Sequence, residues 1–129
     1  MKKIITLIII CLSVVSCTPQ KKSSWHMGKD SNSNGVRDDI ETWIGERFKD
    51  ELPVQKAMLK LASIDPALCE FKYHLGCLRQ VTNDALIIQL ELMEKTLDTP
   101  QRRAAFDQRI TKCKTKDDRY LNLKCDFKL

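Results

Sequence analysis

The chain has 129 residues but few of the types on which catalytic sites are usually built, with only two histidines and four glycines. It contains no G-x-S-x-G nucleophile motif, no H-E-x-x-H zinc motif and no glycine-rich phosphate loop. His26 and His74 lie in different segments and share no evident partner. The sequence therefore offers no catalytic residue, and we expect a protein that is not an enzyme.

A second absence concerns β-structure, since no segment sustains the alternation of apolar and polar residues that a half-buried strand shows. Apolar residues instead recur every three or four positions, which predicts an all-α domain of about four helices. Capping residues and prolines set their expected limits. We expect helices to begin near Asp38, at Pro53, at Asp65–Pro66 and at Pro100, the third running to about Leu97. Their apolar stripes are Ile40, Trp43, Ile44, Phe48 and Leu52; Val54, Ala57, Met58, Leu61 and Ala62; Leu68, Phe71, Leu75, Leu78, Val81, Ala85, Ile88 and Leu92; and Ala105, Phe106 and Ile110.

The N-terminal apolar run falls short of the roughly 20 residues that a permanent membrane helix needs. Met1–Lys3 is basic, residues 4–15 are almost wholly apolar, and Ser16, a small residue, precedes Cys17. A basic start, a short apolar run and a small residue before the cleavage point are the parts of an export signal. The segment resembles the signal of bacterial lipoproteins.

That resemblance implies that residues 1–16 are removed and that Cys17 becomes the N-terminus, carrying fatty acids such as palmitate. Several acyl chains on one residue hold a protein firmly to a membrane. Thr18 is not the aspartate of an inner-membrane retention signal, which favours the outer membrane and a domain facing the periplasm. The alternative is an ordinary secretory signal in which the cysteine has no role.

The exported chain divides into a tether and one domain. Residues 17–29 contain the polar run Pro19–Ser24, which cannot bury apolar surface and is typical of a flexible linker between membrane and domain. Residues 30–129 are enough for a single domain with a modest core.

Charge is spread unevenly along the exported chain. Loss of Lys2 and Lys3 with the signal lowers the formal charge from +5 to +3, yet residues 100–129 hold nine Lys or Arg against four Asp or Glu. This basic C-terminal third is a candidate contact for an anionic surface or an acidic envelope protein, and a solvated helix face is the alternative. We expect no nucleic-acid partner.

Four cysteines remain once Cys11 leaves with the signal and Cys17 carries lipid. An even number in an oxidising compartment predicts two disulfides. Zinc sites usually take ligand pairs two to four residues apart, whereas the spacings here are eight and twelve. The four residues are Cys69, Cys77, Cys113 and Cys125.

The expected helices rank the possible pairings. On one continuous helix Cys69 and Cys77 would lie roughly 12 Å apart, too far for a disulfide. An antiparallel helical hairpin with its turn near residues 95–97 would instead pair Cys77 with Cys113 and Cys69 with Cys125. The alternative pairs Cys69 with Cys77 and Cys113 with Cys125, which requires a helix break near Gly76.

One stretch predicts a bound ion. Residues 30–41 place oxygen-bearing side chains at loop positions 1, 3, 5, 9 and 12 and a glycine, Gly35, at position 6. This pattern resembles EF-hand loops and the similar calcium loops of exported bacterial proteins. The resemblance implies side-chain ligands from Asp30, Asn32, Asn34, Asp38 and Glu41, the last through both oxygens, and a backbone carbonyl ligand from Val36.

Part of the pattern has another explanation. Asp38 and Glu41 resemble a helix capping box, and Asn34–Gly35 is a common turn pair, so neither needs a metal. Position 8, usually aliphatic in paired loops, is Arg37, and the tether leaves no room for an incoming helix. A structural calcium ion therefore fits better than a calcium sensor.

These inferences favour a non-enzymatic envelope lipoprotein with one structural calcium ion that serves as an interaction or scaffold module. Two other functions stay open. An inhibitor or immunity-type lipoprotein would block a toxin or an envelope enzyme, and an envelope hydrolase would use acidic residues.

Overall fold

The computed structural model describes residues 28–110, 125 and 127. The signal at residues 1–16, the lipid-bearing Cys17, most of the tether and Cys113 lie outside the described residues. All regular structure in the described part is α-helical, which confirms the expected class, with one helix more than the four expected. The helices are α1 (Asp38–Arg47), α2 (Leu52–Ala62), α3 (Cys69–Val81), α4 (Ala85–Thr96) and α5 (Pro100–Ile110).

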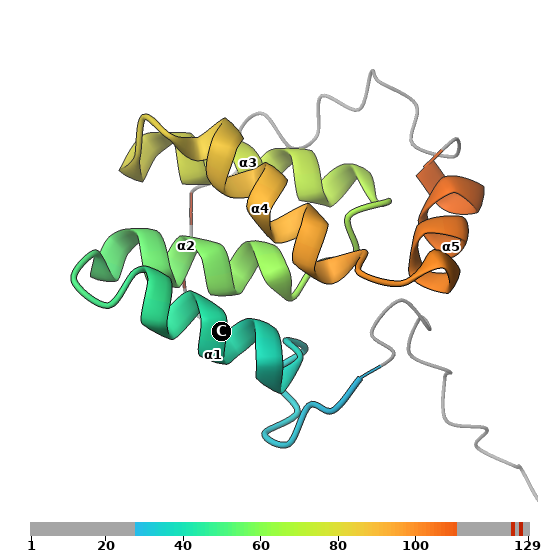
Figure 1. Ribbon diagram of the computed structural model, residues 1–129. Coiled ribbons are helices and arrows are strands. Elements are labelled where there is room, and N and C mark those ends of the chain that lie inside the picture. The colour runs from blue at the N-terminus through green and yellow to red at the C-terminus, as the bar shows by residue number, and fades with distance from the viewer. Residues whose placement is uncertain (1–27, 111–124, 126, 128–129) are drawn as a thin grey trace, which may run out of the picture.

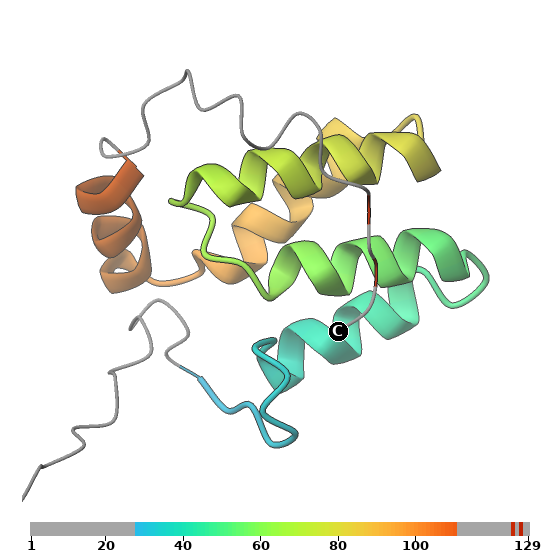
Figure 2. The ribbon, with the colours of Figure 1, turned by 180° about the vertical axis from the view of Figure 1, so that it is seen from behind.

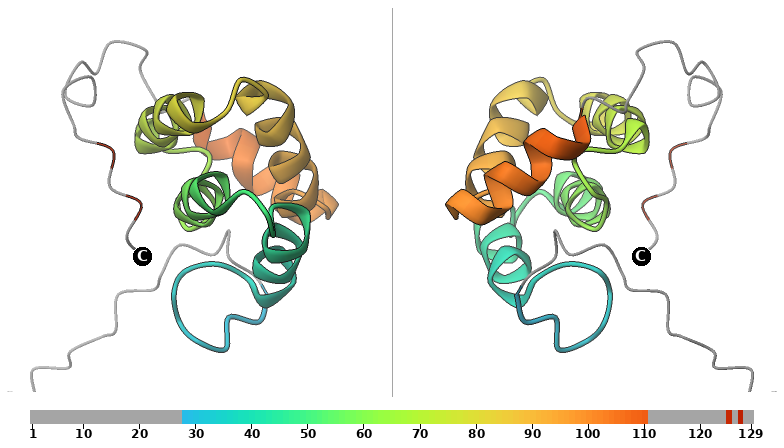
Figure 3. Two further views of the ribbon diagram at one scale, coloured as in Figure 1. Left: turned by 90° about the vertical axis from the view of Figure 1, so that its left-hand side faces the viewer. Right: turned by 90° about the vertical axis from the view of Figure 1, so that its right-hand side faces the viewer.

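The first four helices form one bundle, and α5 stands across one end of it (Figure 1). Consecutive helices of the bundle run in opposite directions, and each packs against the next along the chain. The two end-on views of Figure 3 show the loop that precedes α1 projecting beyond the bundle. Within the described residues no helix is long and apolar enough to cross a membrane.

The core lies between the facing stripes of α1 to α4. All five residues of the expected α2 stripe are buried, and Ile44, Met58, Leu61 and Leu78 are almost fully shielded from solvent. Burying a side chain of this size stabilises the fold by about 1.5–3 kcal/mol. The ends of the stripes were predicted less well, because Leu52 and Leu68 are half exposed.

The single long helix expected over residues 65–97 is wrong. The chain leaves the helical conformation at Thr82, whose φ is −155° and ψ 146°, and reverses before α4. The Thr82 hydroxyl accepts a hydrogen bond of 3.1 Å from the backbone N–H of Asp84. A local side-chain bond of this kind competes with the helical one. The apolar repeat runs through the break in phase, so periodicity alone did not reveal it.

The start of α3 also differs from expectation. Asp65 and Pro66 do not open the helix, which begins at Cys69. The Asp65 carboxylate accepts a 3.0 Å hydrogen bond from the backbone N–H of Ala67 and forms a turn instead. By contrast, the predicted start of the last helix at Pro100 is confirmed. The Thr99 hydroxyl just before it accepts a bond of 3.2 Å from the N–H of Arg102.

The disulfide pairing differs from the expected one. Cys77 is bonded to Cys125, with their Cα atoms 5.5 Å apart, so the predicted pairs Cys77–Cys113 and Cys69–Cys125 are wrong, as is a local bond between Cys69 and Cys77. The ranking assumed an unbroken helix facing α5, and the chain reversal at Thr82 removes that geometry. Cys69 is also disulfide-bonded. The bond places Cys125 beside α3, the helix that Figure 2 shows in front of α4. Phe127 packs against the core.

Candidate metal centre

The loop at residues 30–41 runs directly into α1, and backbone contacts fix both of its ends. The N–H of Asp38, the first residue of α1, donates a 2.8 Å hydrogen bond to the carbonyl of Lys29, just before the loop. Val36 inserts its side chain into the core with 1% exposure. The loop is therefore held closed by the hydrogen bond between Lys29 and Asp38 and attached to the core by the Val36 side chain.

Asp30, at position 1, organises the first half of the loop. One carboxylate oxygen accepts a bond of 3.2 Å from the N–H of Asn34 and the other a bond of 3.0 Å from the N–H of Gly35. Gly35 has a φ of +87°, a conformation that side chains disfavour, and Ser33 also has a positive φ of +57°. The backbone thus wraps around the Asp30 carboxylate at the position where the pattern requires glycine.

Glu41, at position 12, draws the two asparagines together. The side-chain amide of Asn32 donates to both Glu41 oxygens at 3.0 and 3.3 Å, and that of Asn34 donates to one at 3.1 Å. Positions 3, 5 and 12 therefore converge, although Asn32 and Glu41 are nine positions apart in the chain. The asparagine oxygens accept backbone N–H bonds within the loop, from Asn34 to Asn32 and from Val36 to Asn34.

Asp38, at position 9, faces a different partner. Its carboxylate accepts bonds of 2.8 Å from the N–H and 2.7 Å from the hydroxyl of Ser31, and Lys29 lies 3.7 Å away. These contacts, the backbone bond from Ser31 foremost, hold the pKa of the Asp38 carboxyl below its usual value. The structure thus brings Asn32, Asn34 and Glu41 together, ties Asp30 to them through Asn34, and directs Asp38 to Ser31.

The capping box that could have explained Asp38 and Glu41 without a metal is not formed. Arg37 occupies the N-cap position of α1, and no side chain caps it there. Glu41 contacts the asparagine amides instead, and Asp38 lies inside the first turn. The acidic residues in this turn interact favourably with the positive end of the helix.

The donor set suits a hard cation better than a soft one, because all of its side-chain ligand atoms are carboxylate or amide oxygens. A half-turn of each asparagine amide exchanges its nitrogen and oxygen, which would aim two oxygens at the point that the Glu41 carboxylate already faces. That turn gives up the two backbone hydrogen bonds to the amide oxygens and the three amide bonds to Glu41, each worth about 1 kcal/mol. No three His, Cys, Asp or Glu side chains of the described residues gather as a metal cluster, so any cation bound here would need the amide oxygens as well.

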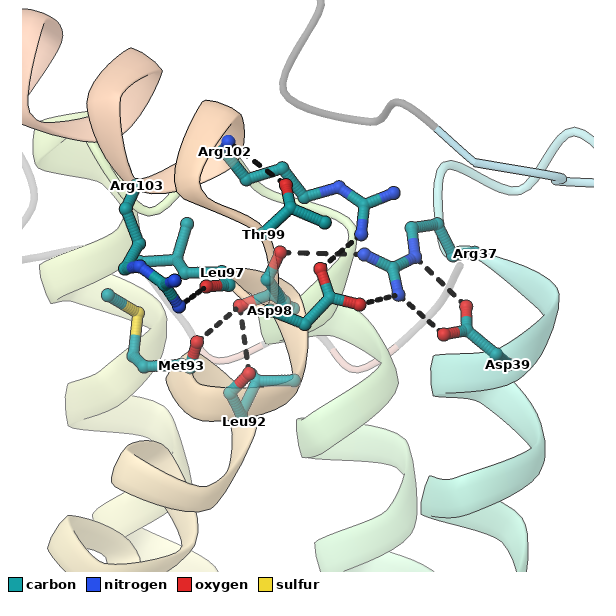
Figure 4. Close-up of polar contacts among 10 residues, drawn as sticks. Arg37, Asp39, Leu92, Met93, Leu97, Asp98, Thr99, Arg102 and Arg103 are labelled. Carbon is teal, nitrogen blue, oxygen red and sulfur yellow. Dashed lines mark hydrogen bonds and ion pairs between the residues drawn. The ribbon is translucent and has the colours of Figure 1, made fainter.

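Arg37 was noted in the sequence only as a departure at position 8, and its role was missed. Its side chain is 7% exposed and points away from the loop toward the junction of α4 and α5 (Figure 4). The hydrogen bond with Asp39 is the main cause that raises the pKa of Arg37, and the same bond lowers the pKa of Asp39. The signal in the sequence was a charged residue at a position that is usually aliphatic and inward-facing, because a charge that becomes buried needs a partner.

His74 is the one histidine among the described residues, and it lies in α3 with 8% exposure. Its Nε2 is 3.7 Å from a carboxylate oxygen of Glu70, and its ring meets that of Tyr73 edge to face. Burial lowers the pKa of His74, and the nearby Glu70 carboxylate only partly offsets that effect. His74 is thus a buried residue of α3.

Comparisons with known proteins add no relative to these observations. No protein-family model matches the chain, and neither the curated proteins nor the solved structures contain a match. The function must therefore be argued from the loop, the helices and their surfaces.

Proposed function

We propose that this chain is a lipid-anchored protein of a bacterial cell envelope that binds one structural calcium ion and serves as a non-enzymatic interaction module. The convergence of Asn32 and Asn34 on Glu41 carries the calcium part of the proposal. Asp30 supports it, because its carboxylate fixes the turn at Gly35. The anchor rests on the lipoprotein-like signal that ends at Cys17.

Calcium bound at this loop would stabilise the start of the domain rather than act as the trigger of a calcium sensor. The loop leads into α1, and a sensor needs a second helix that moves against the first. Three carboxylates and two neutral amides suit the weak binding of extracellular modules, roughly 10⁻⁴–10⁻³ M. An ion held by residues on both sides of Gly35 would keep the tether aligned with α1.

The surface of α4 supports a role in binding another protein. Leu86, Ile87 and Leu90 are 59%, 59% and 60% exposed, while Ala85, Ile88 and Leu92 on the opposite side enter the core. A helix that exposes a cluster of large apolar side chains in addition to its buried face usually has a partner on that outer face as well. Glu94 lies one turn beyond Leu90 on the same exposed side. The partner that fits this face is a protein with an apolar groove that ends in a basic side chain.

The calcium part is tested by calorimetric titration of the mature protein in detergent micelles. We expect one site with a Kd of roughly 10⁻⁴–10⁻³ M, and no binding heat for Asp30→Ala. Asp50→Ala is the matched control, because Asp50 is exposed and lies outside the loop. Absence of heat from the unmodified protein at millimolar calcium would refute a calcium function.

The anchor is tested by growing cells on labelled palmitate. Cys17→Ser should abolish the label, whereas Cys11→Ser, a change of the same kind within the signal, should leave it. Equal labelling of both variants would contradict the lipid anchor.

Crosslinking in intact envelopes distinguishes the interaction module from its alternatives. A structural envelope protein captured through α4 supports the proposal, and capture of a toxin or an envelope enzyme favours the inhibitor function. Turnover of peptidoglycan or lipid by the purified protein would show that the chain is a hydrolase instead.

A further inference from the structure

Arg37 leaves the loop and enters the junction between α4 and α5, as Figure 4 shows. Its Nε donates a bond of 2.9 Å to Asp39, its Nη2 lies 3.2 Å from Asp98, and its Nη1 donates a bond of 3.5 Å to the Thr96 carbonyl. Asp39 belongs to α1, whereas Thr96 and Asp98 lie about 60 positions further along the chain. A single side chain thus joins the exit of the loop to the end of α4.

Asp98 links Arg37 to α5. It pairs with Arg37 through one carboxylate oxygen and with Arg102 of α5 through the other. Burial alone would raise the pKa of Asp98, but the hydrogen bonds from Arg102 and Arg37 outweigh it and lower the pKa. Arg103 adds a 2.9 Å bond to the Leu97 carbonyl. Since α5 buries none of its residues, these polar contacts are a substantial part of its attachment.

Arg37 also touches the start of the loop. A Cβ atom added at Gly28 would lie 2.7 Å from the Cδ of Arg37, closer than two carbons approach without a shift. The aliphatic stem of Arg37 therefore covers the backbone just before the loop, while the guanidinium holds the other end. One residue restrains both ends of residues 30–41.

We propose that Arg37 is a positioning residue that couples the calcium loop to α5, so that calcium stabilises α5 and an attached α5 raises the calcium affinity of the loop. The inference rests on the proposed calcium function. Its physical basis is preorganisation, because a loop already held in shape gives up less conformational freedom when it binds. The coupling must be reciprocal, since an effect of one site on the other has the same size in both directions. Contact with α5 would replace the second loop that EF-hand pairs use.

The test compares two variants of the mature protein in detergent by calcium calorimetry. Asp98→Asn removes the carboxylate shared by Arg37 and Arg102. Glu91→Gln is the matched control, because it also converts a partly exposed carboxylate of this region to an amide but breaks only the pair with Arg47, 3.5 Å apart. We expect the Kd to rise about fivefold for Asp98→Asn, near the lower end of typical coupling, and to stay within about twofold for Glu91→Gln.

A second readout follows α5 directly. Calcium should slow hydrogen exchange of the α5 amides in the unmodified protein and lose this effect in Asp98→Asn. Arg102→Gln, which keeps the pair of Arg37 with Asp98, should lose the effect too, and it serves if Asp98→Asn does not fold. Calcium binding that is unchanged in both variants, with α5 protected as before, would overturn the coupling and leave the calcium function standing. No binding by the unmodified protein would overturn both.

Discussion

Helices α2 and α5 have the same length of eleven residues and a proline at or near their first position, yet different forces hold them. α2 buries Val54, Ala57, Met58, Leu61 and Ala62. α5 buries no residue and is held by ion pairs at each end, from Arg102 to Asp98 and from Arg109 to Asp65. The two helices should therefore lose stability under different conditions, α2 when core side chains are truncated and α5 when its charged partners are removed.

The largest effect is expected from the covalent link that encloses α5 but not α2. The Cys77–Cys125 bond closes a loop with a sequence separation of 48 that contains α4 and α5. Replacing both cysteines by alanine should lower the free energy of unfolding by about 4 kcal/mol, because the unfolded chain regains the freedom of that loop. Urea denaturation measures the loss. An unchanged midpoint would show that the bond does not stabilise this fold.

Truncation within α2 should come next. Leu61 is fully buried, so Leu61→Ala is expected to cost about 3 kcal/mol through lost burial and a residual cavity. Leu52→Ala is the control, because Leu52 begins the same helix and is 56% exposed. Its cost should stay below about 1 kcal/mol. Equal shifts of the urea midpoint would contradict the assignment of the core.

Low pH should destabilise α5 before α2, and we expect this effect on stability to be smaller than that of the core truncation. The folded-state pKa values of Asp39 and Asp98 lie below their usual value of 3.8, so both carboxylates stabilise the fold above that pH. This contribution is lost as the pH falls from about 4 through the folded values, because the unfolded state then binds protons more readily. Amide NMR signals of α5 should change before those of α2 in a titration from pH 6 to pH 2.5. Simultaneous changes would show that α5 does not depend on these charges.

The smallest effect on stability is expected on the outer face of α4. Leu90→Ser should change the free energy of unfolding by no more than about 0.5 kcal/mol, since Leu90 is 60% exposed. The same variant should lose the partner captured by crosslinking. Leu68→Ser, at a half-exposed leucine outside α4, should keep that partner. Equal capture by both variants would exclude the α4 face as the binding surface.

The spacing of apolar residues predicted the features that depend on burial, such as the buried face of a helix. It did not predict the features that depend on local hydrogen bonds, such as the end of α3. Every residue of the α2 stripe was placed correctly, because a helix of that pattern has one face to bury. The reversal at Thr82 was missed, because a hydroxyl bonded to the N–H of Asp84 leaves no trace in the spacing of apolar residues. The error then carried over to the disulfides, since the pairing of Cys77 was inferred from a straight helix.

The loop shows the same limit. Spacing alone identified Asp30, Asn32, Asn34 and Glu41, and these residues do contact one another or the backbone of the loop. The direction of Asp38 toward Ser31 depends on local rotation that no ligand pattern encodes. The partner of Arg37 lies about 60 positions away, and only the fold brings Asp98 to it.

The bond between Cys77 and Cys125 also determines how the protein would respond to a mechanical force applied to its ends. Force applied between the N-terminal side of the domain and Phe127 would pass from α3 through one sulfur bridge to the C-terminal end, and α4 and α5 would bear none of it. At about 3.3–3.6 Å per extended residue, the bridged segment hides roughly 160 Å of chain length. If one end of the chain is anchored as proposed, this length would stay unextended under tension for as long as the bond is intact.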